Sequence, residues 1–480
     1  MIARSKQISL IDPSDQTLVF DDAVPSSTAA FFAAAFAFLC FFPYPAIPAG
    51  NNSAIQIGNI ATLLALLCTS ASLWQSVGPV AALLVMMPMV STLKVLVIDN
   101  ADASVCFKQA AASAISLLTL LAVQLHAPRH ALAMLVGVAI AILVHVSVGI
   151  LQLYSFSSGV FPLADLYVNP SFLSVQDNAE TIARWIQRPF GIFPEPSAMS
   201  CSLAPFVLFF AAVVLNVVRM KNPPSRWQRA LFAAAAAGGL GLIIVSRSGH
   251  AVPTVAAMTV LMVVWTVRAR ATAKTYLLLL SLFCVVLPLV LVFAIDALSS
   301  RVTGGSQLGN DSWAERSNSL LIGYRLWSGH GIATVLLGMG PGMTSAGVND
   351  VSGISAVFSI LFAYVYDTGL LGLIALIWVA HRLFLTWREA RWSIAFFVVA
   401  IVWTIGVAVV TSYSQLLPIW VALGLLSCWN GICEAPLPRQ AVVRGARSCT
   451  RAKRAAGWIS PWAVARAGAR NGGEGTPSSD

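Results

Sequence analysis

The chain has 480 residues, of which 58% are hydrophobic and only 10% are charged, and its formal net charge is +10. A soluble protein of this length needs far more charge, so the composition excludes a soluble globular protein and indicates a polytopic membrane protein. The positive charge does not indicate a nucleic-acid partner, because the basic residues gather at helix ends and in the C-terminal tail, where membrane topology places them.

Apolar windows of roughly 18 or more residues predict membrane-spanning helices. The first window begins near Ala29, which is late for a cleavable signal peptide, so we expect an uncleaved first span. The predicted fold is all-α, a membrane domain over residues 1–433 with about twelve spans. We expect these spans at about 28–47, 54–74, 77–97, 107–126, 131–153, 197–218, 229–247, 250–267, 275–297, 355–381, 393–411 and 415–433. The 355–381 window is long, and we expect a broken or tilted helix around Asp367 and Gly369.

The distribution of Lys and Arg predicts the orientation of these spans. With a cytoplasmic N-terminus, 21 of the 29 basic residues lie on the cytoplasmic side, and twelve spans return the C-terminus there. This topology leaves two long outer segments, at about 155–196 and 298–353. Loops of this length are usually functional or disordered, and their aromatic residues favour folding onto the membrane face. Residues 434–480 form a basic tail that we expect to be mostly disordered, on the cytoplasmic side near anionic lipid.

Several arginines lie on the predicted outer side, against the positive-inside bias. An arginine carries a permanent charge and a donor fork that matches phosphate or pyrophosphate. Two arginine-bearing loops could therefore clamp an anionic lipid head group and stabilise the charge that develops as it leaves. A single outer arginine can equally be solvated or anchor the interface. For the set Arg188, Arg247 and Arg316 we favour a binding role.

The stretch from Arg184 to Ser200 leads directly into an apolar helix and carries one carboxylate, Glu195, between Pro194 and Pro196. Because the prolines restrict the backbone, the carboxylate is held at the membrane edge, where partial burial suits a general base. The alternative is an acidic N-cap, favoured by the helix dipole. Both interpretations of Glu195 remain open at this level.

The second outer segment offers Arg325, His330, Gly338 and Gly340 in addition to Arg316. The glycines let the backbone approach a ligand closely, although the run is not a P-loop because no Lys-Ser/Thr follows it. His330 could act as an acid–base group, or it could be polar surface. Polar loops contain no Asp-x-Asp pair and no His/Cys cluster, so we expect no metal and no cofactor.

Four short motifs together resemble the O-antigen polymerase/ligase superfamily, especially its exopolysaccharide repeat-unit polymerases of the Wzy type. The motifs are Arg188-x-x-Gly191-x-Phe193-x-Glu195-Pro196-Ser197, Ser246-Arg247-Ser248-Gly249, Arg316 followed by Leu337-Gly338-x-Gly340-x-Gly342, and Tyr366-Asp367-x-Gly369-Leu-Leu-Gly372. By motif the resemblance covers about residues 185 to 375, and by span number and outer loops it covers the whole chain.

The resemblance implies a bacterial inner-membrane glycosyltransferase that works on the periplasmic face without metal. Donor and acceptor would both be glycans on polyprenyl pyrophosphate, such as undecaprenyl pyrophosphate, and the product a surface polysaccharide. By the same resemblance Arg188 and Arg316 would bind pyrophosphate, with Arg247 in support and Arg325 nearby. A flippase and a chain-length regulator of an export system are the expected protein partners.

The chain departs from the ligases of this superfamily at one place. Those enzymes resemble one another in a histidine ahead of a Gly-x-x-Gly pair, whereas Phe358 and Ser359 stand at that place before Gly369 and Gly372. This argues against a ligase and leaves the catalytic base open, with Glu195 as first choice and His330 as second. Two other classes stay open, a transporter or flippase for lipid-linked sugars and a non-catalytic scaffold.

Overall fold

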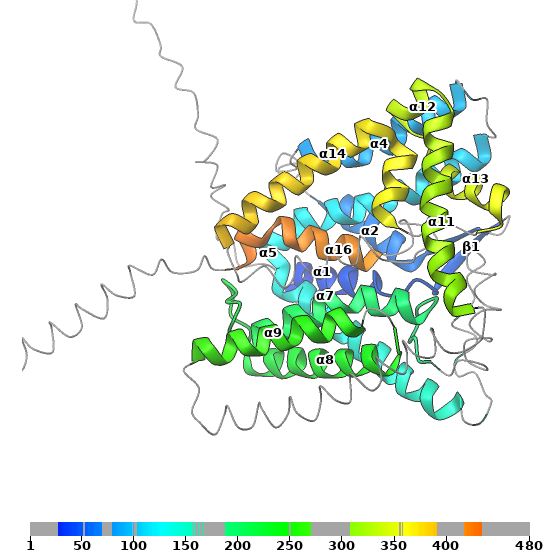
Figure 1. Ribbon diagram of the computed structural model, residues 1–480. Coiled ribbons are helices and arrows are strands. Elements are labelled where there is room, and N and C mark those ends of the chain that lie inside the picture. Colours follow the sequence, from blue (N-terminus) through cyan, green and yellow to red (C-terminus); the bar gives the residue numbers. More distant parts are fainter. Residues whose placement is uncertain are drawn as a thin grey trace, which may run out of the picture.

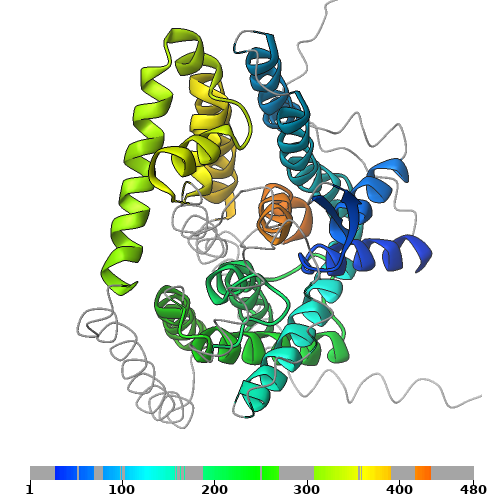
Figure 2. The same ribbon diagram turned by 90° about the vertical axis from the view of Figure 1, so that its right-hand side faces the viewer.

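The computed structural model describes residues 27–50, 53–69, 79–97, 103–156, 188–248, 251–269, 308–354, 359–390 and 417–433, and the single residues 99, 158, 163, 167 and 357. These residues form helices and one two-stranded hairpin, in which β1 and β2 pair antiparallel (Figures 1 and 2). The elements are α1 (Ser27–Leu39), β1 (Ala46–Gly50), β2 (Ser53–Gln56), α2 (Ile57–Leu67), α4 (Pro79–Val97), α5 (Ala103–Phe156), α7 (Pro196–Val214), α8 (Arg226–Val245), α9 (Ala251–Ala269), α11 (Leu308–Gly329), α12 (Ile332–Leu337), α13 (Met343–Ser352), α14 (Ile360–Ala390), α16 (Leu417–Ser427) and α17 (Trp429–Ile432).

Four described helical segments are long and apolar enough to cross a membrane, namely Ala114–Phe156, Pro196–Val214, Arg226–Val245 and Leu361–Trp378. Five shorter apolar helical segments accompany them, and each overlaps a predicted window. The described residues therefore confirm a predominantly helical fold with four helices that could span a membrane, while the number twelve stays a prediction. The predicted spans 275–297 and 393–411, the tail 434–480 and most of the loop 155–196 lie outside the described residues.

The first predicted span, 28–47, is too long. Helix α1 ends at Leu39, where the amides of Phe41 and Phe42 tighten the last turn by bonding the carbonyls of Phe38 and Leu39 at 3.1 and 3.2 Å. Pro43 and Pro45 follow, and a proline has no N–H with which to continue a helix. The chain enters β1 instead, so the hydrophobic window covers a helix and the start of a strand.

The predicted spans 107–126 and 131–153 join in one helix, α5. Its backbone leaves helical geometry only at His130, two residues after Pro128, and the helix bends there. Because proline removes one helical hydrogen bond and crowds the preceding turn, a bend at this place has a direct cause. The part before the bend packs on α2, where Thr62 and Thr119 are 2.9 Å apart. Two helical pieces therefore meet at the boundary between the two predicted spans, with a kink rather than a longer loop between them.

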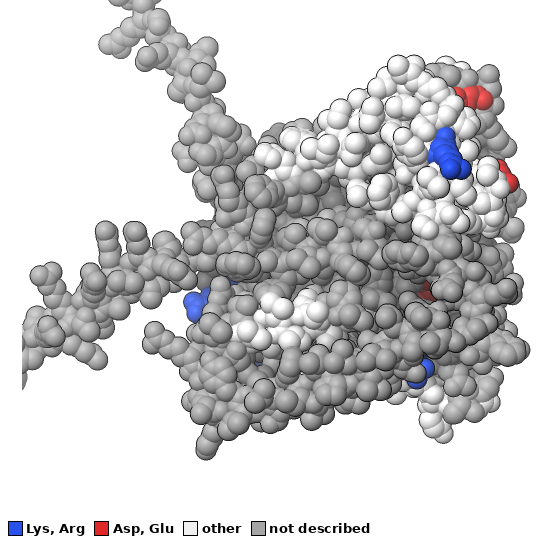
Figure 3. All heavy atoms as spheres, in the orientation of Figure 1, with Lys and Arg blue, Asp and Glu red and all other residues white. Residues whose placement is uncertain are grey.

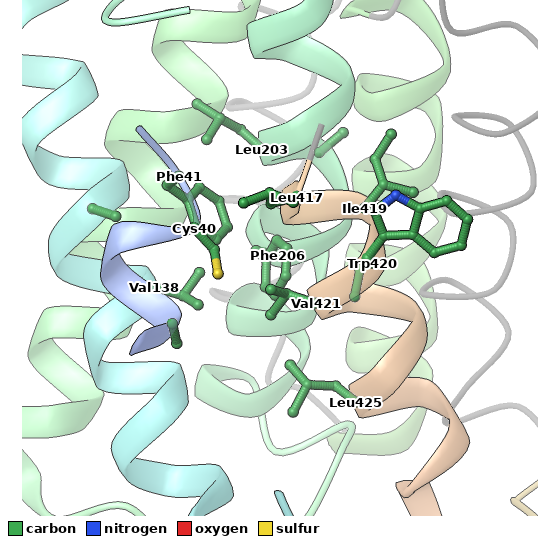
Figure 4. Close-up of a cluster of buried hydrophobic side chains, with 14 of the residues drawn as sticks. Cys40, Phe41, Val138, Leu203, Phe206, Leu417, Ile419, Trp420, Val421 and Leu425 are labelled. Carbon is green, nitrogen blue, oxygen red and sulfur yellow. The ribbon is translucent and has the colours of Figure 1, made fainter. Parts of the chain in front are cut away.

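The core lies where α1, α5, α7 and α16 meet. Figure 4 shows Phe41, Val138, Phe206 and Val421, which come from or directly follow these four elements, directed into one cluster. The rings of Phe41 and Phe206 meet edge to face, with centroids 5.2 Å apart. In a membrane such packing is driven by close van der Waals contact, because lipid tails are as apolar as the side chains.

The described surface is apolar, like the core. Large hydrophobic side chains such as Phe31, Leu67, Ile150 and Ile374 are well exposed on the helices. In Figure 3 the described part of the visible face is mostly white, with charged side chains at separate points. An apolar exterior on apolar helices suits contact with lipid, so composition, helix length and surface agree on a membrane protein.

Helix α14 is broken as predicted. At Gly369 the backbone has φ 71° and ψ −164°, which no helix contains, so two helical pieces meet there. The segment predicted to lie outside, about 298–353, is helical over most of its described residues, and α11, α12 and α13 pack against α14. Its location on the outer face of a membrane stays a prediction. We call these three helices the α11–α13 hairpin.

Candidate functional site

Residues 188–195, which we call the Arg188 loop, lie between α5 and the first turn of α7. Arg188 and Glu195 at its two ends are half-buried, and the six residues between them are buried. Two side chains with opposite charge therefore stand at the ends of one short, otherwise inaccessible segment. Both side chains are only partly accessible, and the Nε atom of Arg188 is itself buried.

Glu195 occupies the N-cap position of α7 with an extended backbone, and Pro196 is the first helical residue. Its side chain makes no capping hydrogen bond to the helix amides. Instead, its Oε1 accepts a hydrogen bond from the Ser197 hydroxyl. The position agrees with the acidic N-cap interpretation, but the carboxylate does not do the work of a cap. Its oxygens are therefore directed to a side-chain donor beside the helix start.

The Arg188 loop is held by polar side chains of α5. Gln152 bonds the amides of Phe190 and Gly191, at 2.9 and 3.0 Å, and the carbonyl of Gly191, at 2.9 Å. His145 accepts a hydrogen bond from the amide of Ile192 at 3.1 Å. Gly191 has φ +58°, and a Cβ on it would lie 2.7 Å from His145 Nδ1, so this close approach requires glycine.

Ser246 and Arg247, at the end of α8, lie beside this loop's helix. The hydroxyls of Ser246 and Ser200 are 3.1 Å apart, which joins the end of α8 to the first turns of α7. Arg247 follows with φ 51°, a left-handed conformation that costs a non-glycine residue about 1 kcal/mol, and its side chain is exposed. Arg188, Glu195 and Arg247 thus belong to elements that contact one another.

Two tyrosines, Tyr44 and Tyr167, are fully buried next to the loop and pack edge to face with centroids 4.9 Å apart. The Tyr167 hydroxyl bonds the Gly191 carbonyl. Burial raises the pKa of both phenols, and the nearby charge of Glu195 raises the pKa of Tyr44 further. Both side chains therefore remain neutral; Tyr167 contributes hydrogen bonding and packing, and Tyr44 contributes packing.

The α11–α13 hairpin carries the other predicted residues. Arg325 and His330 are exposed on and just after α11, and His330 Nδ1 lies 2.5 Å from the Leu326 carbonyl. Arg316 lies on α11, but its side chain is outside the described residues, as is the whole of Arg184. The structure therefore gives Arg316 a helix and no side-chain position.

Gly338 and Gly340 are buried against α14 and α4. The amides of Met339 and Gly340 bond the carbonyls of Tyr366 and Asp367, at 2.9 and 3.0 Å, where α14 breaks. A Cβ on Gly338 would lie 2.2 Å from the Asp367 carbonyl oxygen, and its φ is +85°. The close approach that these glycines permit is therefore made to the protein's own backbone. Their predicted contact with substrate stays a prediction.

Asp367 is 2% exposed and holds the start of α13. Its carboxylate accepts hydrogen bonds from the Gly342 amide at 2.8 Å, the Thr344 hydroxyl at 2.7 Å and the Thr344 amide at 3.3 Å. On α4, the buried Lys94 pairs with Asp99 at 2.6 Å and donates to Thr334 of α12 at 2.9 Å. Two buried ionisable side chains therefore fasten the hairpin to α14 and α4.

The structure brings some predicted residues together and leaves others apart. Helix α8 packs against α7 and α5. Arg188 and Glu195 lie in the loop before α7 and Arg247 follows α8, so these three residues belong to one region. The principal contacts of the α11–α13 hairpin go to α4 and α14. Within the described chain, Arg325 and His330 thus belong to a second region. The predicted meeting of the two arginine-bearing segments stays a prediction.

Sequence reasoning missed Gln152 and His145, although a signal was present. Both are strongly polar, both lie in an apolar helix, and they are two helical turns apart, so they share one face. A buried polar side chain must find hydrogen-bond partners, and this spacing points to one polar target. Within the described residues, no group of three or more His, Cys, Asp or Glu side chains is placed to hold a metal ion.

Comparison with known proteins adds no assignment to this geometry. No protein-family model matches the chain. No curated protein sequence matches it either.

Proposed function

We propose that this protein polymerises oligosaccharide repeat units carried on polyprenyl pyrophosphate, by metal-independent glycosyl transfer at the periplasmic face of a bacterial inner membrane. The observation that supports it most is the Arg188 loop. It holds an arginine and a carboxylate at the two ends of one short segment, at the head of an apolar helix, and that helix contacts Ser246, directly before a second arginine that follows α8. A carboxylate with arginines at a membrane edge suits a sugar acceptor and a pyrophosphate leaving group.

In the proposed reaction Glu195 takes the proton from an acceptor hydroxyl, and the hydroxyl oxygen attacks the anomeric carbon of the donor. The bond from that carbon to the pyrophosphate oxygen breaks, and the electron pair stays on the pyrophosphate. Arg188 and Arg247, joined by Arg316 of the α11–α13 hairpin, stabilise the charge that builds up there. The growing chain is thereby transferred to the free end of a new lipid-linked unit.

Complementation of a strain that lacks this protein tests the proposal, with surface polysaccharide resolved on a gel. We expect Arg188→Ala, Arg316→Ala and Glu195→Gln to lower polymer formation by about 100-fold while single repeat units are still exported. Matched controls are Arg226→Ala at the opposite end of α8 from Arg247, and Asp350→Asn on the exposed surface of α13. Wild-type ladders from all three site variants, with normal membrane levels, would sink the proposal.

A transporter for lipid-linked sugars is the second candidate, because α14 is discontinuous and two ionisable residues are buried. Transporters bind ions and substrates at broken helices with intramembrane charges. Asp367 is buried two residues before the break at Gly369, and Lys94 is buried on α4, which packs against α14. This candidate predicts that Asp367→Asn abolishes export of single units as well as polymer, whereas a polymerase defect spares the single units.

A ligase that moves finished polysaccharide to another acceptor is the third candidate, and it shares the proposed donor chemistry. It predicts polymer of normal length that accumulates on the lipid carrier when Glu195 or Arg188 is replaced. The same gel, run on the lipid-linked fraction, separates this outcome from the loss of polymer.

A further inference from the structure

Three consecutive amides between Arg188 and Glu195 find their partners on α5, while the next amide, that of Phe193, bonds the Phe190 carbonyl at 3.2 Å. Gln152 is fully buried and uses its whole hydrogen-bonding capacity. Its Oε1 accepts from the amides of Phe190 and Gly191, and its Nε2 donates to the Gly191 carbonyl and, at 2.8 Å, to the Tyr167 hydroxyl. The Gln152 amide therefore bonds both N–H and C=O groups of the loop backbone, as a neighbouring β-strand would.

His145, two helical turns earlier on α5, holds the next amide. Its Nδ1 accepts from Ile192 at 3.1 Å, and its Nε2 lies 3.0 Å from the Phe41 carbonyl. Because an amide can only donate and a carbonyl can only accept, these partners assign the proton to Nε2. The ring lies between Phe42 and Phe193, with centroid distances of 5.1 and 4.6 Å, so it has one orientation.

Together the two side chains fix three consecutive amides, those of Phe190, Gly191 and Ile192. Pro189 and Pro194 restrict the loop on either side of them. Arg188 and Glu195 stand at the ends of this fixed segment and can change their separation only if it opens. Enzymes gain most from charged groups that are already in place before the reaction, and a misplacement of about 1 Å can slow a reaction about 100-fold.

We infer that Gln152 and His145 are positioning residues, which set the separation of Arg188 and Glu195 through the backbone of the loop. The inference rests on the function proposed above. It assigns a role to two neutral side chains that touch no substrate, and it makes the rate of transfer depend on hydrogen bonds inside the membrane domain.

Hydrogen–deuterium exchange on the full-length protein in lipid nanodiscs directly measures how firmly Gln152 and His145 hold the loop amides. Gln152→Met keeps the length of the side chain and removes all four hydrogen bonds, so we expect the segment 188–195 to exchange roughly tenfold faster. The matched control is Gln124→Met, the same substitution in the same helix, at a residue whose amide donates to Ser427 of α16 at 2.9 Å. The control should leave exchange in 188–195 unchanged.

A pair of substitutions at His145 separates positioning from general stability. His145→Asn keeps an acceptor near the place of Nδ1, toward Ile192, whereas His145→Gln keeps a polar group near the place of Nε2, toward Phe41. We expect the Asn variant to retain slow exchange at Ile192 and near-normal polymer. The Gln variant should lose both, with roughly tenfold faster exchange, at a similar thermal midpoint.

Faster exchange in 188–195 together with shorter polysaccharide in Gln152→Met and His145→Gln supports the inference. Unchanged exchange in both variants overturns it, and so does faster exchange with polymer of wild-type length. If the wild-type protein restores no polymer at all, the proposed function falls, and the exchange data still decide whether α5 clamps the loop.

Discussion

The Arg188 loop and the α11–α13 hairpin are both fastened to helices of the membrane domain by buried polar side chains, but the fasteners differ in charge. Neutral groups, the Gln152 amide and the His145 imidazole, hold the loop. Ionisable groups, Asp367 and Lys94, hold the hairpin. Burying a neutral polar group requires hydrogen bonds, whereas burying a charge requires hydrogen bonds and compensation of its desolvation. Loss of the buried Asp367 carboxylate should therefore disturb the hairpin more than loss of a neutral fastener disturbs the loop, whereas Lys94, whose partner Asp99 is 40% exposed, should matter less.

The largest effect is expected from Asp367→Ala. The substitution leaves the Gly342 amide and both donors of Thr344 without their buried acceptor, and we expect a loss of about 4 kcal/mol of stability. The thermal midpoint of the purified protein in detergent measures it. Asp367→Asn keeps one acceptor oxygen and should lose about half as much. Equal thermal midpoints for Asp367→Ala and the wild type would show that the Asp367 carboxylate does not stabilise the hairpin.

Gly338→Ala should follow, with a loss of about 3 kcal/mol. The new Cβ meets the backbone carbonyl of Asp367 at 2.2 Å, and a backbone atom in a packed helix cannot move aside as a side chain can. Gly331→Ala is the matched control, since Gly331 has a similar φ of +89° and no atom within 4 Å of its added Cβ. The control reports backbone strain alone, about 1 kcal/mol. The difference between the two midpoints is the contribution of the close approach.

Gly191→Ala is the counterpart in the Arg188 loop and should cost about 2 kcal/mol. Its added Cβ meets the His145 ring at 2.7 Å, so a side chain rather than backbone must shift. We expect the amide of Ile192 to lose its hydrogen bond to His145, and faster hydrogen exchange at 188–195 checks this. A larger destabilisation than that of Gly338→Ala would show that the Arg188 loop tolerates an added side chain less well than the α11–α13 hairpin does.

Lys94→Met should have the smallest effect, about 1 kcal/mol. The Lys94 side chain is 2% exposed but the side chain of its partner Asp99 is 40% exposed, so water already screens the pair. Methionine also fills the space of the lysine stem. A double-mutant cycle with Asp99→Asn isolates the ion pair from the hydrogen bond to Thr334. A coupling energy well above 2 kcal/mol would show that this pair carries the hairpin instead of Asp367.

Parts of the candidate site could be predicted from the sequence because their causes are local. Pro194 and Pro196 place Glu195 at the head of α7, and the structure finds it at the N-cap. Gly369 marks the break in α14 for the same kind of reason. The glycines at 338 and 340 were expected to face a ligand, yet their neighbours are the backbone of α14 and a side chain of α4. A glycine in the sequence indicates that another group approaches the backbone closely, but it does not show whether that group is a ligand or another part of the protein.

The predicted helix boundaries failed where apolar composition and backbone chemistry disagree. Residues 40–47 are apolar enough for a span, but Pro43 and Pro45 stop the helix and a strand follows. Residues 127–130 look like a loop because Pro128 and charged or polar neighbours interrupt the apolar run, but α5 only bends there. Hydropathy indicates whether a segment is apolar, whereas backbone hydrogen bonding determines where its helices end or bend.

The sequence by itself determined that the fold is predominantly helical, because long apolar runs with few charges satisfy their backbone hydrogen bonds internally when they form helices. It also determined where the charged and proline-flanked segments enter those helices. The tertiary structure alone decided which buried polar group meets which loop. Gln152 and Gly191 are 39 residues apart, Asp367 and Thr344 are 23 apart, and Ser91 reaches the Asp367 carbonyl across 276 residues. Such pairs depend on packing geometry between helices, and that geometry leaves no local pattern in the chain.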